Sequence, residues 1–423
     1  MKALLIGNGG REHALAWKLL QSPSIDGIIC IPGNGGTALL PRCQNLGLTL
    51  SDFEGIARVA LVHNLSLVIV GPEQPLADGI ADYLRAQGLF VFGPSQAGAQ
   101  IESSKSWAKE LMSEANIPTA PSAVFTDAHA AIAYLQTQSL PIVVKADGLA
   151  AGKGVTVAQT REEAIAAIEA SFNGKFGTAG KQIIIEAYLI GQEVSVLAVT
   201  DGKTIRPLLP AQDHKPIGEG DTGANTGGMG AYAPTPVLPP ELLDQVQESI
   251  LEPALSQLQQ RNIDYRGVLY AGLMISSEGN PFVIEFNCRF GDPETQVILP
   301  LLKTPLDEIL FACAEGNLSN LPPIQWKAQS AACVVAAASG YPDSYQKGMA
   351  ITGLEAATEN GALVFHAGTK LQANEVKASG GRVLSVTALG DTLTSALEAV
   401  YEAIAKIHFE TMYYRRDIGY RMR

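Results

Sequence analysis

The chain has 423 residues, which is too long for a single compact core and predicts about two to four domains. Apolar residues make up 47% of it, which excludes a largely disordered chain, and 42 acidic against 30 basic residues argue against nonspecific nucleic-acid binding. Five scattered cysteines without a CxxC pair indicate a reduced, cytoplasmic protein without a thiolate zinc site. The N-terminal apolar run is too short for a signal peptide, and no apolar run reaches about 18 residues, so we expect no membrane association.

Strands and helices are expected to alternate over residues 1–95. The strand-like runs KALLI, GIICI, LSLVIV and LFVFG are separated by helical patterns, of which EHALAWKLLQS and LADGIADYLRAQG are the clearest. This alternation predicts a parallel sheet with right-handed crossovers. A capped helical pattern and a proline-rich link, ESSKSWAKELMSEANIPTAPS, then indicate a domain boundary.

A glycine-rich turn at 7–10 follows the first predicted strand. It matches a dinucleotide fingerprint only in part, because Glu12 stands at the third glycine position and Pro32-Gly33 stands where a ribose-binding acid is expected. A nicotinamide cofactor is therefore not expected there. The turn either binds a phosphate or sugar phosphate through its N–H groups and the helix dipole, or is a tight turn without a ligand.

A second glycine loop lies between the strand-like runs PIVVKA and GVTVAQ. It contains Gly148, Gly152, Lys153 and Gly154, but it is one residue short of a P-loop, lacks the Ser or Thr and returns into a strand. This pattern predicts a hairpin flap over phosphates, with Lys153 and backbone N–H groups as donors. Lys145, on the strand before it, either faces an anion or points outward from an edge strand.

The next block carries the strand-like runs EVSVLAVTD, TIRPLLP, VLYAGLMIS and PFVIEFN, and a helix near 240–260. Between them lies a long polar stretch, QDHKPIGEGDTGANTGGMGAY, which is read as a substrate loop because loops of this length are usually functional or disordered. Asp213 is suited to hold a substrate ammonium group and Lys215 an anion. His214 alone is more often a structural or surface histidine.

Period-two alternation in PFVIEFNCRFGDPET places Val283, Glu285 and Asn287 on one face of a strand, and Arg289 joins them if the strand continues. Two oxygen ligands at this spacing suit Mg²⁺, which completes its shell with water and phosphate. Arg289 is suited to bind a carboxylate or a transferring phosphoryl group. The alternative is a solvated strand face, because an E-x-N pair is a weak signal.

Several motifs resemble, in their order along the chain, those of the phosphoribosylamine–glycine ligases (glycinamide ribonucleotide synthetases), a family of ATP-grasp enzymes. They are GNGGREHALAW, IVGPE, KADGLAAGKGV, QDHK…DTGANTGGMGAY, VIEFNCRFGDPETQ, FHAGTK and GGRVLSVTALG, and the resemblance runs from Met1 to about Tyr420. It implies an α/β fold in three parts with a lid. The parts are an N-terminal Rossmann-like parallel-sheet domain at 1–102, an ATP-grasp core at 103–122 and 191–325, a small lid subdomain at 123–190 and a C-terminal α+β domain at 326–423.

The resemblance implies ATP-dependent ligation of glycine to 5-phosphoribosylamine in de novo purine biosynthesis, giving glycinamide ribonucleotide, ADP and phosphate through a glycyl phosphate. It implies Mg²⁺ or Mn²⁺, no nucleic-acid or membrane partner, and a monomer or weak homodimer. The rivals are another ATP-grasp carboxylate–amine ligase or carboxylase that uses formate or bicarbonate, and a non-catalytic ATP-binding module. An NAD-dependent oxidoreductase is a distant third.

The family pattern also implies roles for single residues. Lys105 and Lys145 would bind the ATP phosphates, and Glu285 and Asn287 the metal. Asp213 and Arg289 would hold the amine and the carboxylate of glycine, with Lys215 beside them. The remaining nucleotide contacts would be the flap residues Gly152, Lys153 and Gly154, the hinge residues Glu186, Tyr188 and Leu189, and Glu193 at the ribose. Phosphoribosylamine would be held by Asn8, Gly9, Gly10, Arg11, Pro32, Gly33, Asn34 and Glu73.

Two departures from the family pattern stand out. The hinge has Ala187 where a second acid is frequent, and the run VLYAGLMIS offers no metal ligand. A second metal ion would therefore need Glu285 as a bridge, or mostly water and phosphate ligands.

Overall fold

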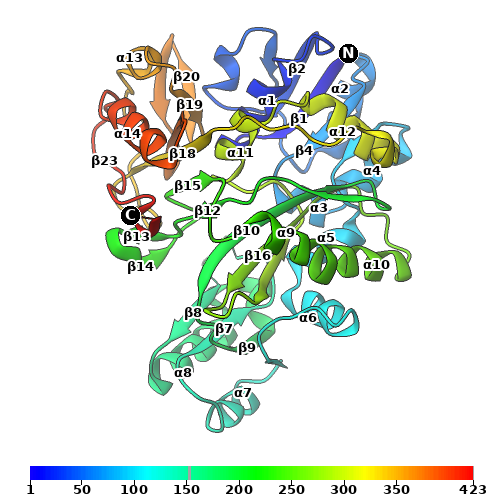
Figure 1. The fold of residues 1–423 in the computed structure, drawn as a ribbon, viewed down its shortest axis with the longest axis vertical. Coiled ribbons are helices and arrows are strands. Elements are labelled where there is room, and N and C mark those ends of the chain that lie inside the picture. The colour runs from blue at the N-terminus through cyan, green and yellow to red at the C-terminus, as the bar shows by residue number, and fades with distance from the viewer. Residues whose placement is uncertain (151–153, 423) are drawn as a thin grey trace.

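The N-terminal part forms the predicted parallel sheet, in a computed structural model that describes residues 1–150 and 154–422 (Figure 1). Both faces of this sheet are buried, because Leu4 and Ile6 pack into one hydrophobic cluster while Ala3 and Leu5 pack into another. This explains why its strands read as continuous apolar runs. The strand order is β3 (Cys43–Asn45), β2 (Gly27–Pro32), β1 (Lys2–Gly7), β4 (Leu67–Val70) and β5 (Val91–Phe92).

Helices connect these strands, and a glycine divides one that the sequence predicts as continuous. Gly79 has a φ of 91°, in the left-handed region, so the pattern LADGIADYLRAQG forms two short helices with a break between them. The helices of this part are α1 (Gly10–Leu19), α2 (Phe53–Val62), α3 (Glu73–Ala77), α4 (Ile80–Ala86) and α5 (Gln96–Ser103), with the 3₁₀ turn η1 (Thr37–Leu39).

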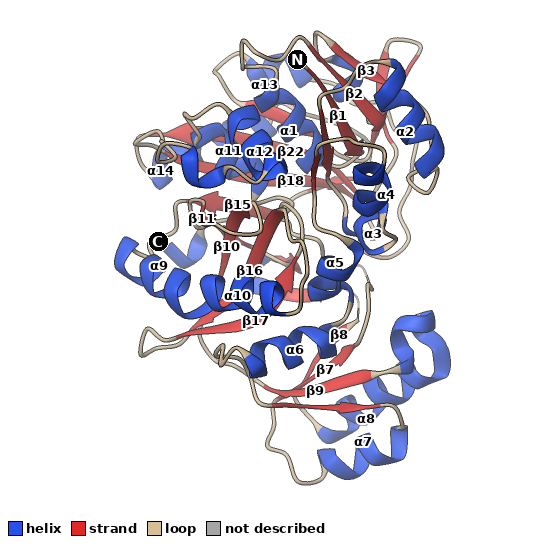
Figure 2. Ribbon diagram, turned by 90° about the vertical axis from the view of Figure 1, so that its right-hand side faces the viewer, coloured by secondary structure: helices blue, strands red, loops and turns tan. Residues whose placement is uncertain are grey.

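A small antiparallel sheet with helices on one face projects from the body, at the bottom of Figure 2. Helix α6 (Lys105–Glu114) leads toward it and is capped by Ser104, whose side chain accepts a hydrogen bond from the N–H of Trp107. The sheet and its helices have their own apolar cluster. The elements are β6 (Ser122–Phe125), α7 (Ala128–Leu135), β7 (Ile142–Ala146), β8 (Val155–Ala158), α8 (Arg161–Ala170), η2 (Ser171–Lys175), η3 (Gly177–Lys181) and β9 (Ile183–Ala187).

A four-stranded antiparallel sheet occupies the centre of the molecule (Figure 1). One apolar cluster joins it to α6 and to the N-terminal sheet, so these parts share a core. The helix predicted near 240–260 is interrupted by a π-helical turn at its middle. The elements are β10 (Gln192–Thr200), β11 (Ile205–Pro207), α9 (Pro240–Val246), η5 (Gln247–Leu251), α10 (Glu252–Gln260), β16 (Gly267–Ile275), β17 (Pro281–Asn287), α11 (Thr295–Leu301) and α12 (Leu306–Glu315).

A β-bulge in β17 changes the predicted faces of this strand. Leu273 pairs with Val283 and Gly272 with Glu285, so Ile284 is an extra residue between them. The expectation that Val283 shares a face with Glu285 is therefore wrong, because the bulge shifts the alternation by one. Val283 packs in the core with Phe286, on the face opposite Glu285.

The polar stretch 212–232 is not one irregular loop. It supplies β12 (Gln212–Asp213) and β15 (Gly230–Ala233), which pair with each other, and a hairpin of β13 (Pro216–Gly218) and β14 (Thr222–Asn225) between them. β15 also pairs with a strand from the C-terminal part, so the stretch joins that sheet. The remaining elements are η4 (Glu219–Asp221), η6 (Leu318–Asn320), β18 (Ser330–Ala338), α13 (Leu354–Thr358), β19 (Leu363–His366), β20 (Thr369–Gln372), β21 (Glu375–Ala378), β22 (Arg382–Gly390), α14 (Leu393–Ile404), β23 (Met412–Tyr413) and η7 (Tyr420–Met422).

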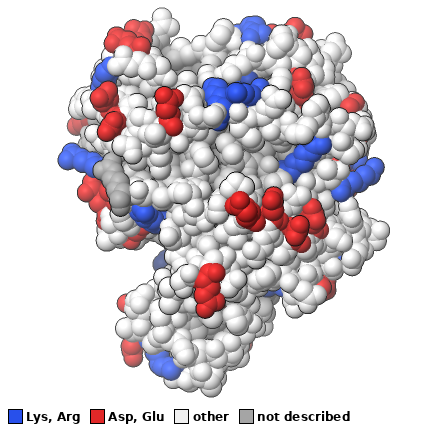
Figure 3. Space-filling view, in the orientation of Figure 1, with Lys and Arg blue, Asp and Glu red and all other residues white. Residues whose placement is uncertain are grey.

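Charged side chains are spread over the face shown in Figure 3, where lysines and arginines stand apart from one another. Acidic side chains gather over α9 and α10, where Glu241, Asp244, Glu248 and Glu252 are exposed. None of the helices in the described residues is both long and apolar enough to cross a membrane.

Candidate functional site

A cavity of about 580 Å³ lies where the N-terminal sheet, the central sheet and the small sheet meet. Most of the residues that the sequence singles out lie on its wall, although they come from segments far apart in the chain. The predicted residues that line it are Asn8, Gly9, Arg11, Glu73, Lys105, Lys145, Gly154, Glu186, Tyr188, Leu189, Glu193, Asp213, Lys215, Glu285, Asn287 and Arg289. Gly152 and Lys153 lie outside the described residues.

The turn after β1 is closed by Glu12. Its carboxylate accepts a hydrogen bond from the Gly9 N–H at 2.5 Å and fills the crevice between the ends of β1 and β4. A Cβ at Gly7 would lie 2.6 Å from the Glu12 side chain, and one at Gly71 would lie 2.0 Å from its Oε1. Gly7 and Gly71 therefore make room for the Glu12 side chain. Glu12 occupies the place where, in dinucleotide-binding Rossmann folds, the glycine-rich backbone approaches the dinucleotide.

The other residues predicted around this turn support it within the protein. The Asn34 side-chain amide donates to the carbonyl oxygens of Asn8 at 3.0 Å and His366 at 2.7 Å. Gly10 packs so closely on Gln296 that a Cβ would lie 2.6 Å from its Nε2. Among the described residues, the cavity wall does not include Gly10, Pro32, Gly33 or Asn34.

Two lysines of α6 and one of β7 converge on the middle of the cavity. Lys145 Nζ lies 2.9 Å from Glu186 Oε2 and donates to the carbonyl oxygen of Ile284, the bulge residue, at 3.1 Å. Lys109 Nζ lies 3.4 Å from the other Glu186 oxygen, and Lys105 Nζ donates to the Gly148 carbonyl at 3.0 Å. Burial lowers the pKa of Lys105 and of Lys109. The Glu186 carboxylate is thus neutralised by the protein.

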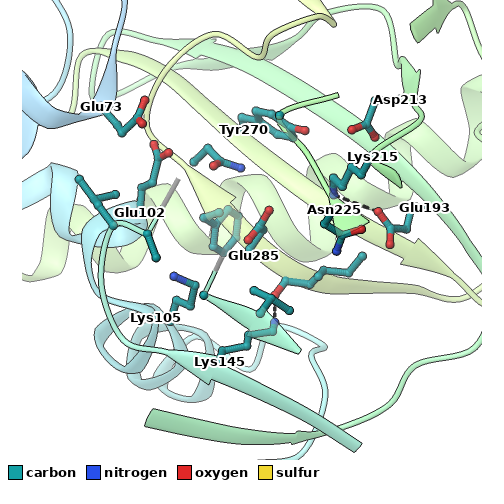
Figure 4. A pocket seen from close by; sticks show the side chains of 18 of the residues that line it. Glu73, Glu102, Lys105, Lys145, Glu193, Asp213, Lys215, Asn225, Tyr270 and Glu285 are labelled. Atoms are coloured by element: carbon teal, nitrogen blue, oxygen red, sulfur yellow. Dashed lines mark hydrogen bonds and ion pairs between the residues drawn. The ribbon is translucent and has the colours of Figure 1, made fainter. Parts of the chain in front are cut away.

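Glu285 is the carboxylate at the centre of this group (Figure 4). Burial alone would raise its pKa, but four cationic side chains together hold it below its ordinary value: Lys215, Lys145, Lys105 and Arg289. Glu285 is therefore ionised at neutral pH, with four cationic side chains acting on it.

Arg289 is held between two carboxylates from the N-terminal part. Its Nε lies 3.3 Å from Glu73 Oε2 and its Nη2 lies 3.0 Å from Glu102 Oε1. Glu102 also accepts a hydrogen bond from the Cys288 N–H at 2.8 Å, so it fixes both the backbone and the side chain at the end of β17. Burial would lower the pKa of Arg289, but Glu102 and Glu73 raise it. Burial raises the pKa of Glu102 although Arg289 opposes this shift.

A second charged group surrounds Asp213 on the opposite wall (Figure 4). Burial raises the pKa of Asp213 to about 7, while Lys215 opposes the shift and Glu294 adds to it. Lys215 Nζ lies 2.9 Å from Glu193 Oε2. Burial alone would lower the pKa of Lys215, but Glu193 and Asp213, with Glu285 and Tyr270, together raise it. Glu294 accepts hydrogen bonds from the hydroxyls of Tyr270 and Ser195.

Several charged residues that line the cavity were not singled out from the sequence, among them Glu102, Lys109 and Glu294. Lys109 lies four residues after Lys105, so both fall on one face of α6, and this spacing was a usable signal. Glu294 belongs to the turn GDPET at the end of the stretch PFVIEFNCRFGDPET, and the strand pattern there assigns it no role. Glu102 had no local signal, because the partners of its side chain are more than 180 residues away.

Glu102→Gln is expected to lower the free energy of unfolding by about 2 kcal/mol and kcat about ten-fold, because the amide keeps an acceptor for Cys288 but no longer opposes the charge of Arg289. Chemical denaturation measures the first effect, and steady-state kinetics of the ATP-dependent reaction that the resemblance implies measure the second. Glu169→Gln, at an exposed position of α8, is the matched control. Unfolding and kcat equal to those of the control would contradict a positioning role for Glu102.

Comparisons with known proteins agree with this arrangement. Sequence models for the phosphoribosylglycinamide synthetase N domain, ATP-grasp (A) domain and C domain match residues 1–102, 103–295 and 331–421. A phosphoribosylamine–glycine ligase of Nostoc sp. is 64% identical over all of both chains. That of Yersinia pestis is 48% identical over 100% of this chain and 99% of its own.

Solved structures extend the likeness to the fold. A phosphoribosylamine–glycine ligase of Thermotoga maritima superposes with a TM-score of 0.85 at 31% identity, covering 99% of this chain and 100% of its own. The biotin carboxylase domain of a Hydrogenobacter thermophilus 2-oxoglutarate carboxylase, solved with MgADP and bicarbonate, has a TM-score of 0.74 at 16% identity, covering 98% and 91%. The chain belongs to the phosphoribosylamine–glycine ligase family, carbon–nitrogen ligases of the ATP-grasp type in purine biosynthesis.

Proposed function

We propose that the cavity binds ATP, glycine and 5-phosphoribosylamine together and joins the last two through a glycyl phosphate. The observation that carries this proposal is the ionised carboxylate of Glu285 with four cationic side chains acting on it, in a cavity where three parts of the chain meet. Four cations gathered at one point of the cavity wall suit a triphosphate and the carboxylate that it activates. Catalysis of phosphoryl transfer relies mainly on such positioning and neutralisation of charge.

The nucleotide is proposed to lie between the small sheet and the central sheet. Lys105, Lys145 and the flap with Gly152, Lys153 and Gly154 bind its phosphates, and Glu193 binds the ribose. The hinge residues 186–189 bind the adenine through their backbone. The engagement of the Glu186 carboxylate by two lysines supports a backbone contact, because that side chain is already paired.

The donor set at Glu285 and Asn287 fits a Mg²⁺ or Mn²⁺ ion, because an ionised carboxylate and an amide line the cavity two residues apart. Within the described part of the chain, no group of three or more His, Cys, Asp or Glu side chains is placed to hold a metal ion. An ion here would take its other ligands from water and phosphate. When bound, it would neutralise charge on the phosphates.

Glycine is proposed to lie between Arg289 and Asp213, with its carboxylate toward Arg289 and Lys215 and its ammonium group toward Asp213. The γ-phosphoryl group of ATP passes to a glycine carboxylate oxygen, and ADP leaves. The amine of phosphoribosylamine then attacks the acyl carbon, phosphate leaves, and the amine gives up a proton. The cationic side chains offset the negative charge that accumulates on the transferred phosphoryl group.

Phosphoribosylamine is proposed to lie at the turn after β1, against Asn8, Gly9, Arg11 and Glu73. Gly10, Pro32, Gly33 and Asn34 are proposed to act indirectly by holding this turn. The bonds of Asn34 to the turn support this division of roles. The chain is proposed to act in the cytoplasm as a monomer or weak homodimer.

Release of ADP is expected to require glycine and phosphoribosylamine together, with the amine formed in solution from ribose 5-phosphate and ammonia. In the control reactions one of the two substrates is omitted, or formate or bicarbonate replaces glycine, and the rate of ADP release is measured again. Full activity with formate or bicarbonate would contradict the proposed substrate. Binding of ATP without turnover under any of these conditions would favour a non-catalytic ATP-binding module.

A further inference from the structure

We propose that the C-terminal segment 413–421 acts as a clamp that positions Asp213, Lys215 and the hairpin after them. This inference rests on the proposed function, in which Asp213 and Lys215 contact glycine. Within this reading, Arg421, Asp221 and His214 are positioning residues that do not themselves touch a substrate.

The clamp contacts His214, which lies between Asp213 and Lys215 in the sequence. Asp213 and Lys215 line the cavity, and His214 between them is fully buried on the opposite side, at 0% exposure. Its Nε2 accepts a hydrogen bond from the Gly419 N–H at 3.0 Å. Burial lowers the pKa of His214, so the neutral ring carries its proton on Nδ1, which lies 3.5 Å from Asp221 Oδ1.

Asp221, in the hairpin, collects three donors from the same C-terminal segment. Arg415 Nη1 donates to it at 2.9 Å, the Tyr420 hydroxyl at 2.7 Å and Arg421 Nε at 2.9 Å. Burial would raise the pKa of Asp221, but these bonds and His214 lower it far below its ordinary value.

Backbone contacts extend the clamp along the hairpin. Arg415 donates to the Pro216 carbonyl at 3.0 Å, the Tyr413 hydroxyl donates to the Ile217 carbonyl at 2.8 Å, and the Gly220 N–H donates to Asp417 at 2.7 Å. Arg415 is itself fully buried. The hairpin has little packing of its own, because β14 is exposed along its whole length. Its position therefore depends on these polar contacts.

Both ends of the clamped hairpin return to the cavity. Lys215 lies at the start, and Asn225 and Thr226 lie on the cavity wall at the end. The Thr226 N–H and hydroxyl both donate to the Lys215 carbonyl, at 2.8 and 2.7 Å, and close the loop. A shift of the hairpin would therefore move Lys215 and Asp213 relative to Glu285 on the opposite wall.

Arg421→Ala tests the clamp, because this side chain is partly exposed and its loss leaves Arg415 and Tyr420 on Asp221. We expect kcat/KM for glycine to fall about five- to ten-fold, which corresponds to about 1 to 1.4 kcal/mol, while KM for ATP changes less than about two-fold. Hydrogen exchange should rise in peptides that cover 212–226 and stay unchanged in the small sheet. Millimolar guanidinium should restore activity, and potassium chloride at the same concentration should not.

Arg416→Ala is the matched control, since it removes the same charge from the same segment. Its bond to Glu219 comes from the backbone N–H, which the substitution keeps. Glycine kinetics and hydrogen exchange equal to those of this control would overturn the clamp. If hydrogen exchange over 212–226 becomes faster in Arg421→Ala but kcat/KM falls for ATP or phosphoribosylamine and not for glycine, the clamp is supported and the assignment of Asp213 and Lys215 to glycine is contradicted. Faster hydrogen exchange over 212–226 with unchanged kcat and KM for all substrates would overturn the positioning role of Arg421.

Discussion

Glu285→Gln is expected to lower the rate of ADP formation about a thousand-fold or more while the chain stays folded. Glutamine keeps the size of the side chain and one oxygen, but it removes the anion that the four cations Lys105, Lys145, Lys215 and Arg289 surround. In the proposed function this anion binds the metal ion, so its loss leaves the phosphates without that neutralisation. The rate is measured in an ADP-release assay with both substrates present.

The same change has a second expected consequence, which does not depend on catalysis. Without the carboxylate the four cations repel one another, so the melting temperature of the free protein should fall at low salt. Added triphosphate should restore it, because a bound polyanion replaces the missing charge. Glu278→Gln, on the exposed turn between β16 and β17, is the control for both measurements. Near-normal turnover of Glu285→Gln would remove Glu285 from the metal site.

The sequence predicted the fold class and the family because its signals are local. Strand–helix alternation predicts the parallel sheet, and the glycine loop before β8 predicts a hairpin rather than a P-loop. The bulge at Ile284 had no such signal, because period-two alternation assumes an unbroken strand. Its effect is visible only through the pairing of β17 with β16, which moves Val283 into the core.

In the candidate site, too, local spacing identifies residues, whereas the contacts of their side chains depend on residues distant in the sequence. Glu285 and Asn287 are found from their spacing on one strand. The strand ends at Asn287, so Arg289 lies beyond it, but the structure brings all three to the same cavity as Asp213 and Lys215. What each side chain is free to do depends on distant partners. The resemblance suggested Asn34 as a ligand of phosphoribosylamine, yet its amide is bonded to the turn itself, and its partner His366 lies more than 300 residues away.

Asp213→Asn is expected to lower kcat/KM for glycine about a hundred-fold and to remove an acidic limb from its pH profile. Burial raises the pKa of Asp213 to about 7, with Glu294 and Glu193 adding to the shift and Lys215 and Arg421 opposing it. In the proposed function the ionised form holds the ammonium group of glycine. For the unaltered protein, kcat/KM for glycine should therefore rise with pH and level off above about 7, whereas KM for ATP should change little.

The pH dependence of stability tests the same carboxyl group independently. It runs in the opposite direction to the pH dependence of kcat/KM, because this group's contribution to stability falls as the pH rises. Between about pH 4 and pH 7 the folded chain keeps a proton on Asp213 that the unfolded chain releases, so this group's contribution to stability falls as the pH rises through that window. The asparagine variant lacks this proton, so its melting temperature should decline less between about pH 5 and pH 7.5. Asp244→Asn, an exposed position on α9, should follow the unaltered protein in both measurements. An acidic limb that persists in Asp213→Asn would assign the titration to another group and contradict the role of Asp213, because a carboxyl that is no longer present cannot set the profile.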